Sequence, residues 1–550
     1  MEFIYESRKF GIPHDYFFKI QVIANNNNNI TYYHLSITPI EENIYDDLFI
    51  KTVAKALGGN EAIIEKDFNN VILFKTEFHK KMFNQIKTNK KATITIKELQ
   101  TKYPIINWLL FLNKLINLPE LTIIENKLIT LNVEDFGDLL KLILHTPKRI
   151  LSNYMITRTM QYIITYLPAL YNSTFKQNLK INSVQVAIES LPLAINVWYV
   201  KKYFTSITKN QVKEILTNIK NKFKDTLENT KLFDKPTKNC AINKLNAMTA
   251  DIGYSEEMFN DSLIKSYYNK LQTSFGYCLD AVLSANKFKI DTNFRKLDLS
   301  LSADWNNTGI DVTKMNVYYN LETNHIVIPA AFILYTSHNQ NGLNYLNYAT
   351  LGFTIGQQIT YGFVRGKYGL NGTLNQCWSP EITKTFEEKN QCFINQYKNF
   401  TMFNTPINSN FTLLDNIADN NGLRLAYNTY QALKSKNTEQ KLPGLNFNEN
   451  QMFWISYAQA QCERMTESYF IQHAQYESRV PQACRITGTL SNMENFAKDF
   501  NCKVNAPMNP IKKCTVWCLN SFVVIFLVTL FLNFANLDRY DCDIPEVLVC

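Results

Sequence analysis

The sequence of 550 residues predicts a mainly α-helical fold with a small β component. Apolar residues recur at helical spacing over most of the chain, whereas strand-like stretches are confined to residues 10–45 and to the region just after residue 300. Hydrophobic residues make up 46% of the chain and charged residues 19%, as in a packed globular protein. The length is too great for one compact core, so we expect two domains, 1–300 and 301–517, followed by a tail, 518–550.

The expected elements follow in order along the chain. Two alternating stretches on either side of the asparagine run 25–29 predict a β-hairpin. The apolar face of residues 104–116 predicts a helix, and residues 137–171 predict a nearly continuous helix that is broken around Pro147. Helical patterns continue to about Thr230, and β-branched and aromatic residues after residue 300 then predict strands. Packing in the core is sufficient to explain these apolar stripes.

The net charge of +9 is spread over the helical stretches and contains no basic block. Nucleic-acid binding usually requires a clustered basic patch, so we predict no nucleic-acid partner. The seven histidines are also scattered, and none stands at metal-ligand spacing from another. They are His14, His34, His79, His145, His325, His338 and His473. We expect His325 to be a polar residue on a strand.

The stretch from Tyr345 to Phe363 organises the candidate site. Its apolar residues recur every four positions and predict one buried helix face. They are Leu351, Ile355, Ile359 and Phe363. Gln357 and Tyr361 are also four apart and share another face, with Gln358 beside them. This is the spacing of the H-E-x-x-H helix, in which two imidazoles bind zinc and a glutamate activates water. Here an amide, an amide and a phenol occupy those positions, so the geometry is present without the chemistry.

Further motifs stand in a fixed order on both sides of this helix. Upstream, MNVYYNLETNHIVIPAAF (315–332) contains Asn316, Tyr318, Tyr319, Pro329 and Ala330. Downstream stand LLDNIADNNGLRLAY (413–427), RITGTLSN (485–492) and MNPIKKCTVW (508–517). The first two segments resemble the V-N-A-Y-Y-N…I-x-x-P-A and G-E-N-I-A-D-N-G-G-L motifs of the neprilysin family of zinc metallopeptidases. The later segments match that family in order, and the resemblance extends over about residues 10–517.

The resemblance implies a zincin-like (thermolysin-like) domain and a large helical domain that together enclose a cleft. It also implies where the zinc ligands would stand. The two histidine positions are Gln357 and Tyr361, and the third ligand position is Asp415, which replaces a glutamate. An amide and a neutral phenol are poor zinc ligands, and aspartate is one methylene shorter than glutamate. We therefore predict no bound cofactor, although the family uses zinc.

The catalytic positions implied by the resemblance are altered as well. Gln358 stands at the position of the catalytic glutamate, and an amide cannot take a proton from water at neutral pH. Arg479 stands at the position of the oxyanion histidine, with Glu477 at the aspartate before it. Asp419 matches the aspartate that orients a ligand imidazole. We predict a catalytically inactive pseudopeptidase. One alternative is an active zinc metalloendopeptidase with non-standard ligands, and another is a product that folds poorly.

The positions that bind the peptide in the family are retained. Asn316 matches the residue that hydrogen-bonds the substrate backbone, and Arg485 matches the arginine that grips a substrate carbonyl. The edge strand around Val317 would pair with an extended peptide. We predict peptides as binding partners. The alternative is that these residues persist because the fold packs around them.

Eleven cysteines are present. Cys392 and Cys514 match a disulfide pair of the family, and we predict that they are bonded. Cys462 and Cys502 match cysteines whose family partners lie in an N-terminal segment that precedes the matched region, so they pair with each other or stay free. Four more cysteines have no counterpart, and each is expected to be a free buried thiol. They are Cys240, Cys278, Cys377 and Cys484. The alternative for the last two is a bridge between them.

Seven N-x-S/T sequons and the cysteines favour an oxidising compartment, so we expect a cell-surface or secreted protein. The sequons are Asn29, Asn172, Asn260, Asn306, Asn371, Asn399 and Asn410. No signal peptide or anchor is visible in the first residues, and the chain is expected to begin after the membrane helix of the family, as a short form or an incomplete gene model. As a helix, the apolar run 521–532 would span only about 18 Å, which is less than the hydrocarbon core of about 30 Å. Extended to residues 518–535, the segment predicts a marginal membrane-spanning helix. The alternative origin of this tail is a mis-joined exon.

Overall fold

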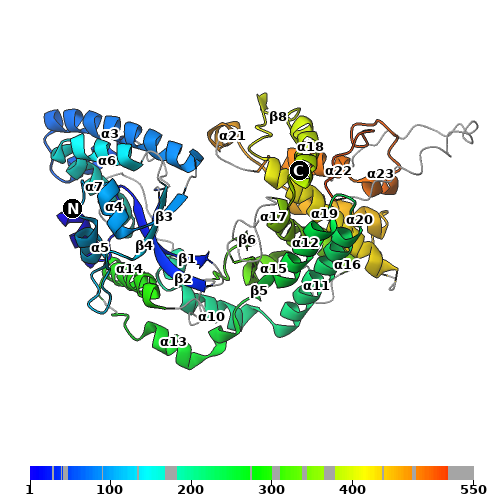
Figure 1. Ribbon diagram of the computed structural model, residues 1–550, viewed down its shortest axis with the longest axis horizontal. Coiled ribbons are helices and arrows are strands. Elements are labelled where there is room, and N and C mark those ends of the chain that lie inside the picture. Colours follow the sequence, from blue (N-terminus) through cyan, green and yellow to red (C-terminus); the bar gives the residue numbers. More distant parts are fainter. Residues whose placement is uncertain are drawn as a thin grey trace, which may run out of the picture. The chain divides into compact units, whose positions relative to one another are not determined.

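The computed structural model describes residues 1–27, 30–38, 40, 47–88, 91–132, 136–167, 183–272, 276–299, 310–321, 323–336, 343–364, 378–435, 439–473 and 479–517. The fold is mainly helical with small sheets, as predicted, and it divides into two compact units (Figure 1). The first unit comprises Met1–Ile195 and Glu257–Gly309, and the second comprises Asn196–Glu256 and Ile310–Cys550. The domains expected from the sequence, 1–300 and 301–517, differ from these units, because the helices within residues 196–256 pack with the second unit.

The first unit contains a four-stranded sheet in the order β1-β2-β4-β3. Its strands are β1 (Lys19–Asn27), β2 (Ile30–Thr38), β3 (Lys91–Thr95) and β4 (Leu128–Asn132). Strands β1 and β2 pair antiparallel, which confirms the predicted hairpin, and β2 pairs parallel with β4. Residues 33–37 of β2 are all buried, with the apolar Leu35 and Ile37 on one face of the strand and the polar His34 and Ser36 on the other, so both faces of this strand are covered.

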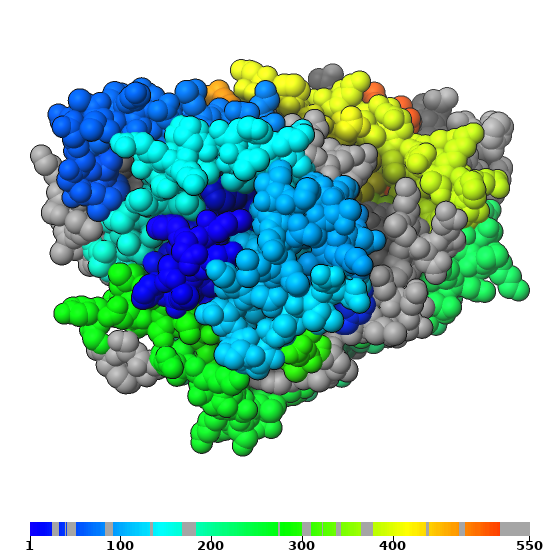
Figure 2. All heavy atoms as spheres, turned by 60° about the vertical axis from the view of Figure 1, so that its left-hand side comes forward, coloured from blue at the N-terminus to red at the C-terminus, as the bar shows by residue number. Residues whose placement is uncertain are grey.

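Helices surround this sheet. They are α1 (Glu2–Lys9), α2 (Asp47–Ala56), α3 (Glu61–Thr88), α4 (Ile96–Lys102), α5 (Trp108–Ile116), α6 (Phe136–His145), α7 (Lys148–Ile163), α9 (Ser183–Ser190), α13 (Asp261–Tyr268) and α14 (Cys278–Arg295), and α10 (Pro192–Tyr203) crosses into the second unit. The break around Pro147 is confirmed, because α6 ends at His145 and Pro147 precedes α7. In Figure 2, α1 (dark blue) lies against the residues of α4 and α5 (lighter blue), and the rings of Tyr5 and Phe111 are 5.9 Å apart.

A buried histidine makes the first unit sensitive to acid. His34 on β2 is 2% exposed, and its Nε2 lies 2.6 Å from the Thr130 hydroxyl. Burial lowers the pKa of His34 from about 6.5 to about 4. Between these two values the unfolded chain binds a proton that the folded chain does not bind. Stability is therefore lost as the pH falls from about 6.5 to about 4.

We expect the melting temperature to fall over this pH range, and to fall less in the His34→Gln variant than in the wild type. Thermal unfolding measured at several pH values between 7 and about 4 tests this, the range following from the shifted pKa. His145→Gln, which changes an exposed histidine, serves as the control. If His34→Gln and the wild type lose stability in parallel, His34 does not cause the acid sensitivity.

The second unit holds a three-stranded sheet in the order β5-β7-β6, so β6 forms one edge. The strands are β5 (Thr249–Gly253), β6 (Tyr318–Asn320) and β7 (His325–Pro329). The helices are α11 (Ser206–Asn229), α12 (Lys235–Ala247), α15 (Ala330–Thr336), α16 (Asn344–Asn347), α17 (Phe353–Val364), α18 (Pro380–Tyr397), α19 (Leu413–Lys434), α20 (Glu449–Ala460), α21 (Glu467–His473), α22 (Gln482–Ser491) and α23 (Glu494–Asp499). A short hairpin of β8 (Thr401–Met402) and β9 (Thr405–Pro406) follows α18.

His325 begins β7, as expected of a polar strand residue. Its Nδ1 lies 2.8 Å from the Thr249 hydroxyl, and its Nε2 lies 3.4 Å from the Asp251 carboxylate. Both partners belong to the neighbouring strand β5. These contacts give the side chain a role in the pairing of the two strands.

The disulfide between Cys392 on α18 and Cys514 is present, as predicted. Cys462 and Cys502 are both disulfide-bonded, so the alternative in which they stay free is wrong. Cys240 is also disulfide-bonded and is therefore not the free thiol that we expected. Cys484 is free and buried, as expected. Cys278 is free, as expected, but it is exposed, so the expectation of burial is wrong for this residue. A bridge from Cys484 to Cys377 is therefore wrong, and Cys377 itself lies outside the described residues.

The Cys392–Cys514 bridge joins two segments that are 122 residues apart in sequence. We expect Cys392→Ser to lower the free energy of unfolding by about 2–5 kcal/mol and to make Cys514 reactive toward thiol reagents. Chemical denaturation and thiol labelling measure the two effects. Cys278→Ser, which removes an exposed free thiol, is the control and should change neither result. An unaltered unfolding curve together with an unreactive Cys514 would contradict this prediction.

No helix within the described ranges is both long enough and apolar enough to cross a membrane. The predicted membrane-spanning segment 518–535 lies outside those ranges. His338 and Glu477 also lie outside them.

Candidate functional site

The candidate site is built on two helices, α17 and α19, that touch through their backbones. A Cβ atom added to Gly422 of α19 would lie 2.5 Å from the backbone nitrogen of Gln357 on α17. A Cβ added to Gly356 would lie 2.8 Å from the carbonyl oxygen of Gly422. Both distances are shorter than any side chain tolerates, so glycine is required on each side of this crossing. The crossing holds the side chains that follow Gly356 against α19.

The predicted helix 345–363 is confirmed, with one local change. It consists of α16, a π-helical turn at Tyr348–Gly352, and α17. The four apolar residues that were expected to share a buried face are no more than 3% exposed. They are Leu351, Ile355, Ile359 and Phe363. A π turn adds a residue to one turn of the helix and often stands at functional sites.

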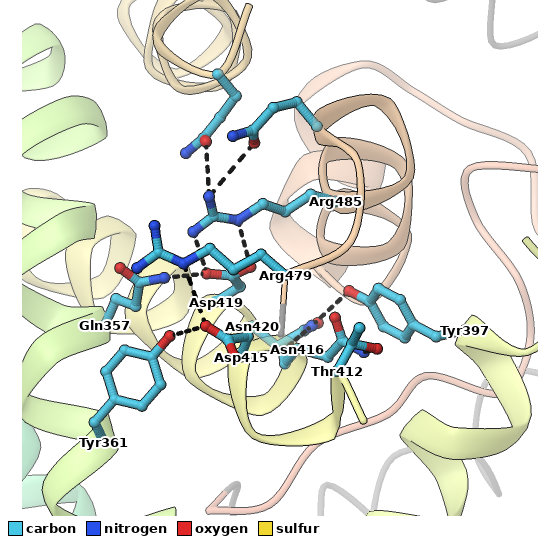
Figure 3. Close-up of polar contacts among 12 residues, drawn as sticks. Gln357, Tyr361, Tyr397, Thr412, Asp415, Asn416, Asp419, Asn420, Arg479 and Arg485 are labelled. Carbon is cyan, nitrogen blue, oxygen red and sulfur yellow. Dashed lines mark hydrogen bonds and ion pairs between the residues drawn. The ribbon is translucent and has the colours of Figure 1, made fainter. Parts of the chain in front are cut away.

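Gln357 and Tyr361 face α19 together, as their spacing of four predicts. The Nε2 of Gln357 donates a hydrogen bond to Oδ1 of Asp419 at 2.5 Å, and the hydroxyl of Tyr361 donates to Oδ1 of Asp415 (Figure 3). The two aspartates are themselves four apart on α19. Gln358 is 2% exposed and donates to Oε1 of Gln357 at 3.2 Å. The structure thus brings together all five of these predicted positions.

A buried ion pair closes one end of the site. Arg485 on α22 donates from Nε to Oδ2 of Asp419 at 2.5 Å and from Nη2 to Oδ1 at 2.6 Å (Figure 3). The side chains are 6% and 2% exposed. Burial acts to lower the pKa of Arg485, but the Asp419 carboxylate outweighs it and raises this pKa above its ordinary value. Burial raises the pKa of Asp419, and Arg485 acts against that rise. Two charge-assisted hydrogen bonds make this a closed bidentate pair.

The donors of Arg485 are directed at the protein itself. Its Nη1 donates to Oε1 of Gln461 at 3.2 Å and to Oε1 of Gln482 at 3.4 Å. Its Nε, Nη1 and Nη2 therefore all have protein acceptors. The grip on a substrate carbonyl that the resemblance implied would have to compete with these hydrogen bonds.

A second, more open ion pair involves Arg479 and Asp415. The Nε of Arg479 donates to Oδ1 of Asp415 at 3.3 Å. The Arg479 side chain is 46% exposed, whereas the Asp415 side chain is 10% exposed. Asp415 therefore accepts hydrogen bonds from a phenol and from a guanidinium at the same oxygen. The negative charge of Asp415 is therefore balanced by the guanidinium of Arg479.

The residues at the zinc positions do not fit a zinc ion. Burial raises the pKa of Tyr361 well above its ordinary value, and Asp415 raises it further. The phenol therefore stays protonated, and its hydroxyl donates a hydrogen bond to Asp415. Gln357 directs its NH₂ group at Asp419, where a ligand imidazole would stand in the family. Both carboxylates already face a guanidinium. Within the described residues, no three His, Cys, Asp or Glu side chains are grouped to hold a metal. Zinc prefers histidine, cysteine and free carboxylate ligands.

Sequence reasoning missed a polar network beside the aspartates. Asn420 donates from Nδ2 to the hydroxyl of Tyr397 at 3.1 Å, and Asn416 donates to the hydroxyl of Thr412 at 3.0 Å (Figure 3). The repeat D-N-x-x-D-N, in which each asparagine follows an aspartate, was the available signal. It places the asparagines on a neighbouring stripe of α19. No comparable signal marks Gln461, which reaches Arg485 from the end of α20.

The predicted peptide-binding positions lie on and before the edge strand β6. Asn316 is exposed and Val317 is 3% exposed, just ahead of Tyr318–Asn320. Tyr319 of this strand lies beside Gly362 of α17, because a Cβ there would be 3.2 Å from its hydroxyl oxygen. The edge strand therefore runs next to the helix that bears Gln357 and Tyr361.

The chain resembles known proteins over most of its length. Two models, both described as peptidase family M13, match residues 25–255 and 316–516. Neprilysin-2 of Drosophila melanogaster is 32% identical over 451 residues, which cover 76% of this chain and 58% of that protein. An endothelin-converting enzyme homolog of Locusta migratoria is 28% identical over 85% of this chain and 68% of its own length. The chain thus spans about three fifths to two thirds of these relatives.

Solved structures share the fold. The zinc metalloprotease Zmp1 of Mycobacterium tuberculosis, solved with an inhibitor, matches 91% of this chain and 80% of its own chain with a TM-score of 0.74 and 17% identity. A Haemonchus galactose-containing glycoprotein complex matches 94% of this chain and 84% of its own chain with a TM-score of 0.76 and 18% identity. The two family models together cover most of the sequence, and the relatives match in both halves. The chain therefore belongs to peptidase family M13.

Proposed function

We propose that this protein is a catalytically inactive member of its family, a pseudopeptidase that binds peptides without cleaving them. The observation that carries this proposal is the set of side chains between α17 and α19. An amide, an amide and a protonated phenol stand where a zinc peptidase needs two imidazoles and a carboxylate base. The two remaining carboxylates are balanced by Arg479 and Arg485. Among the described side chains of this site, no carboxylate or imidazole is left free to activate water.

Peptide binding is supported by the edge strand. The exposed Asn316 precedes β6, which lies at one end of the sheet order β5-β7-β6, so no strand of the described ranges pairs with its outer edge. An extended peptide that adds to such an edge gains main-chain hydrogen bonds whether or not a metal is bound. Recognition and hydrolysis therefore depend on different groups in this fold.

The alternative function is that of an active zinc metalloendopeptidase. Family membership favours it, as do the names of relatives such as the endothelin-converting enzymes and zinc metalloprotease Zmp1. It would require Asp415 and non-standard partners to hold zinc while Arg479 stays nearby. The charge of that guanidinium opposes a divalent cation at the same carboxylate.

We further propose that the protein works at the cell surface or is secreted. Disulfide-bonded cysteines support an oxidising compartment. The three sequon asparagines in the described ranges are all exposed, as N-glycosylation requires. They are Asn260, Asn399 and Asn410.

Elemental analysis of purified protein tests the proposed function. We expect far less than one zinc per chain, because loss of both imidazoles removes most of the binding free energy of such a site. Incubation with excess zinc followed by desalting should leave that result unchanged. About one zinc per chain, lost in the Asp415→Ala variant, would instead support the active enzyme.

A further inference from the structure

A pocket with an arginine in its wall opens beside the candidate site. It is open to solvent. Its lining comes from the segment between α18 and α19, from α21 with the residues before it, and from the residues just before α22. Seven of the ten described lining residues are apolar or aromatic, among them Ile407, Met465, Phe470 and Val480. We call this space the Arg479 pocket, after its one charged lining residue.

The apolar surface continues beyond the pocket. Phe403 is 38% exposed and lies 6.0 Å, ring to ring, from Phe470. Tyr469 lines the pocket and is 45% exposed. Large apolar side chains left in water around a concave site are typical of a surface that binds a ligand.

The guanidinium of Arg479 has donors to spare. Only its Nε has an assigned acceptor within the described part of the chain, which is Asp415 (Figure 3). Arginine carries five N–H donors, so the two terminal NH₂ groups provide four more. They form the planar fork that binds a carboxylate through two hydrogen bonds. A carboxylate can therefore bind without displacing Asp415.

One kind of peptide group satisfies both features of the pocket. A C-terminal residue carries its carboxylate and its side chain on the same Cα atom, so a single residue can fill the apolar lining and reach Arg479. An internal acidic residue fits less well, because the side chains of its neighbours in an extended chain point to the opposite face.

We propose that the Arg479 pocket binds the free C-terminus of a peptide that ends in an aliphatic residue. This inference rests on the proposed function and deepens it by naming the end of the peptide that is recognised. Arg479 stands at a position where the resemblance implied an oxyanion histidine. In this chain the residue serves recognition of a carboxylate instead.

Fluorescence anisotropy on the full chain tests the proposal. The probe is a fluorescein-labelled peptide, Gly-Ser-Gly-Ser-Gly-Leu, with a free C-terminus. We expect it to bind at least about tenfold more tightly than the same peptide with a C-terminal amide, because hydrogen bonds to a charged group are lost. Arg479→Gln should abolish the difference. Arg464→Gln, which changes an exposed arginine outside the lining, should preserve it. Met465→Trp, which fills the pocket, should remove the preference for leucine over glycine at the terminus.

Several outcomes would overturn the inference. These are no measurable binding of the free acid, equal binding of acid and amide, or an unchanged ratio in a folded Arg479→Gln variant. Equal binding of an amidated peptide that ends in Leu-Asp would assign the site to acidic side chains instead. Zinc content and probe cleavage are measured on the same samples. Stoichiometric zinc or a cleaved probe would overturn the proposed function, whereas the ratio of acid to amide binding alone decides the role of the pocket.

Discussion

Arg485→Met should lower the free energy of unfolding by about 3–5 kcal/mol, the cost typical of leaving one member of a buried ion pair without its partner. The substitution keeps an unbranched apolar stem but removes the guanidinium group with its charge and donors. Asp419 would then remain 1% exposed, with the Gln357 amide as its one remaining donor in the described network. Chemical denaturation of the full chain, followed by tryptophan fluorescence, measures the loss.

Two comparisons make this experiment specific. Arg479→Met removes an arginine from the more open pair with Asp415 and should cost no more than about 1 kcal/mol, as exposed pairs do. The double variant Asp419→Leu with Arg485→Met removes both buried charges and should recover part of the loss. Equal effects of Arg485→Met and Arg479→Met would mean that the buried pair contributes no more to stability than a surface pair.

Four substitutions should convert the site into one that binds zinc. They are Gln357→His, Gln358→Glu, Tyr361→His and Asp415→Glu. Gln357 and Tyr361 already face the two aspartates of α19, so the new imidazoles and the longer carboxylate should converge. Asp419, which now accepts from Gln357, would orient the new imidazole. We expect zinc content to rise from far below one to about one per chain, as measured by elemental analysis.

Turnover should stay poor until Arg479→His is added. Oxyanion stabilisation typically contributes about 2.7–4 kcal/mol, so hydrolysis of a peptide should rise by about 10²–10³ in the five-fold variant. Removing the guanidinium should also strengthen zinc binding, because its charge opposes the metal at residue 415. The variant that lacks only Tyr361→His is the matched control and should hold little zinc. If the four-fold variant is well folded but binds no zinc, α17 does not correspond to the zinc-binding helix of the family.

Much of this site could be predicted from local sequence patterns. The spacing of Gln357 and Tyr361 predicts a shared helix face, and the structure confirms it through their contacts with Asp419 and Asp415. The hairpin and the break at Pro147 also follow from local rules. Such patterns succeed because they depend on residues no more than four positions apart.

Interactions between distant segments could not be predicted in the same way. Arg485 was expected to grip a substrate, but it donates hydrogen bonds to Asp419 and Gln461, which lie 66 and 24 positions away. The pairing of Arg479 with Asp415 spans 64 positions. No periodicity records such contacts, because they arise only when packing brings the helices together. The grouping of residues 196–256 with the second unit likewise depends on contacts between distant segments.

The contact between Gly356 and Gly422 makes the spacing of α17 and α19 independent of the side chains at the zinc positions. The distance between α17 and α19 is set by backbone atoms, so it does not change when Gln357, Tyr361 or Asp415 is exchanged. No bound ligand is therefore needed to hold the two helices at this separation. The two glycines, unlike the ligand positions, have no tolerated substitute.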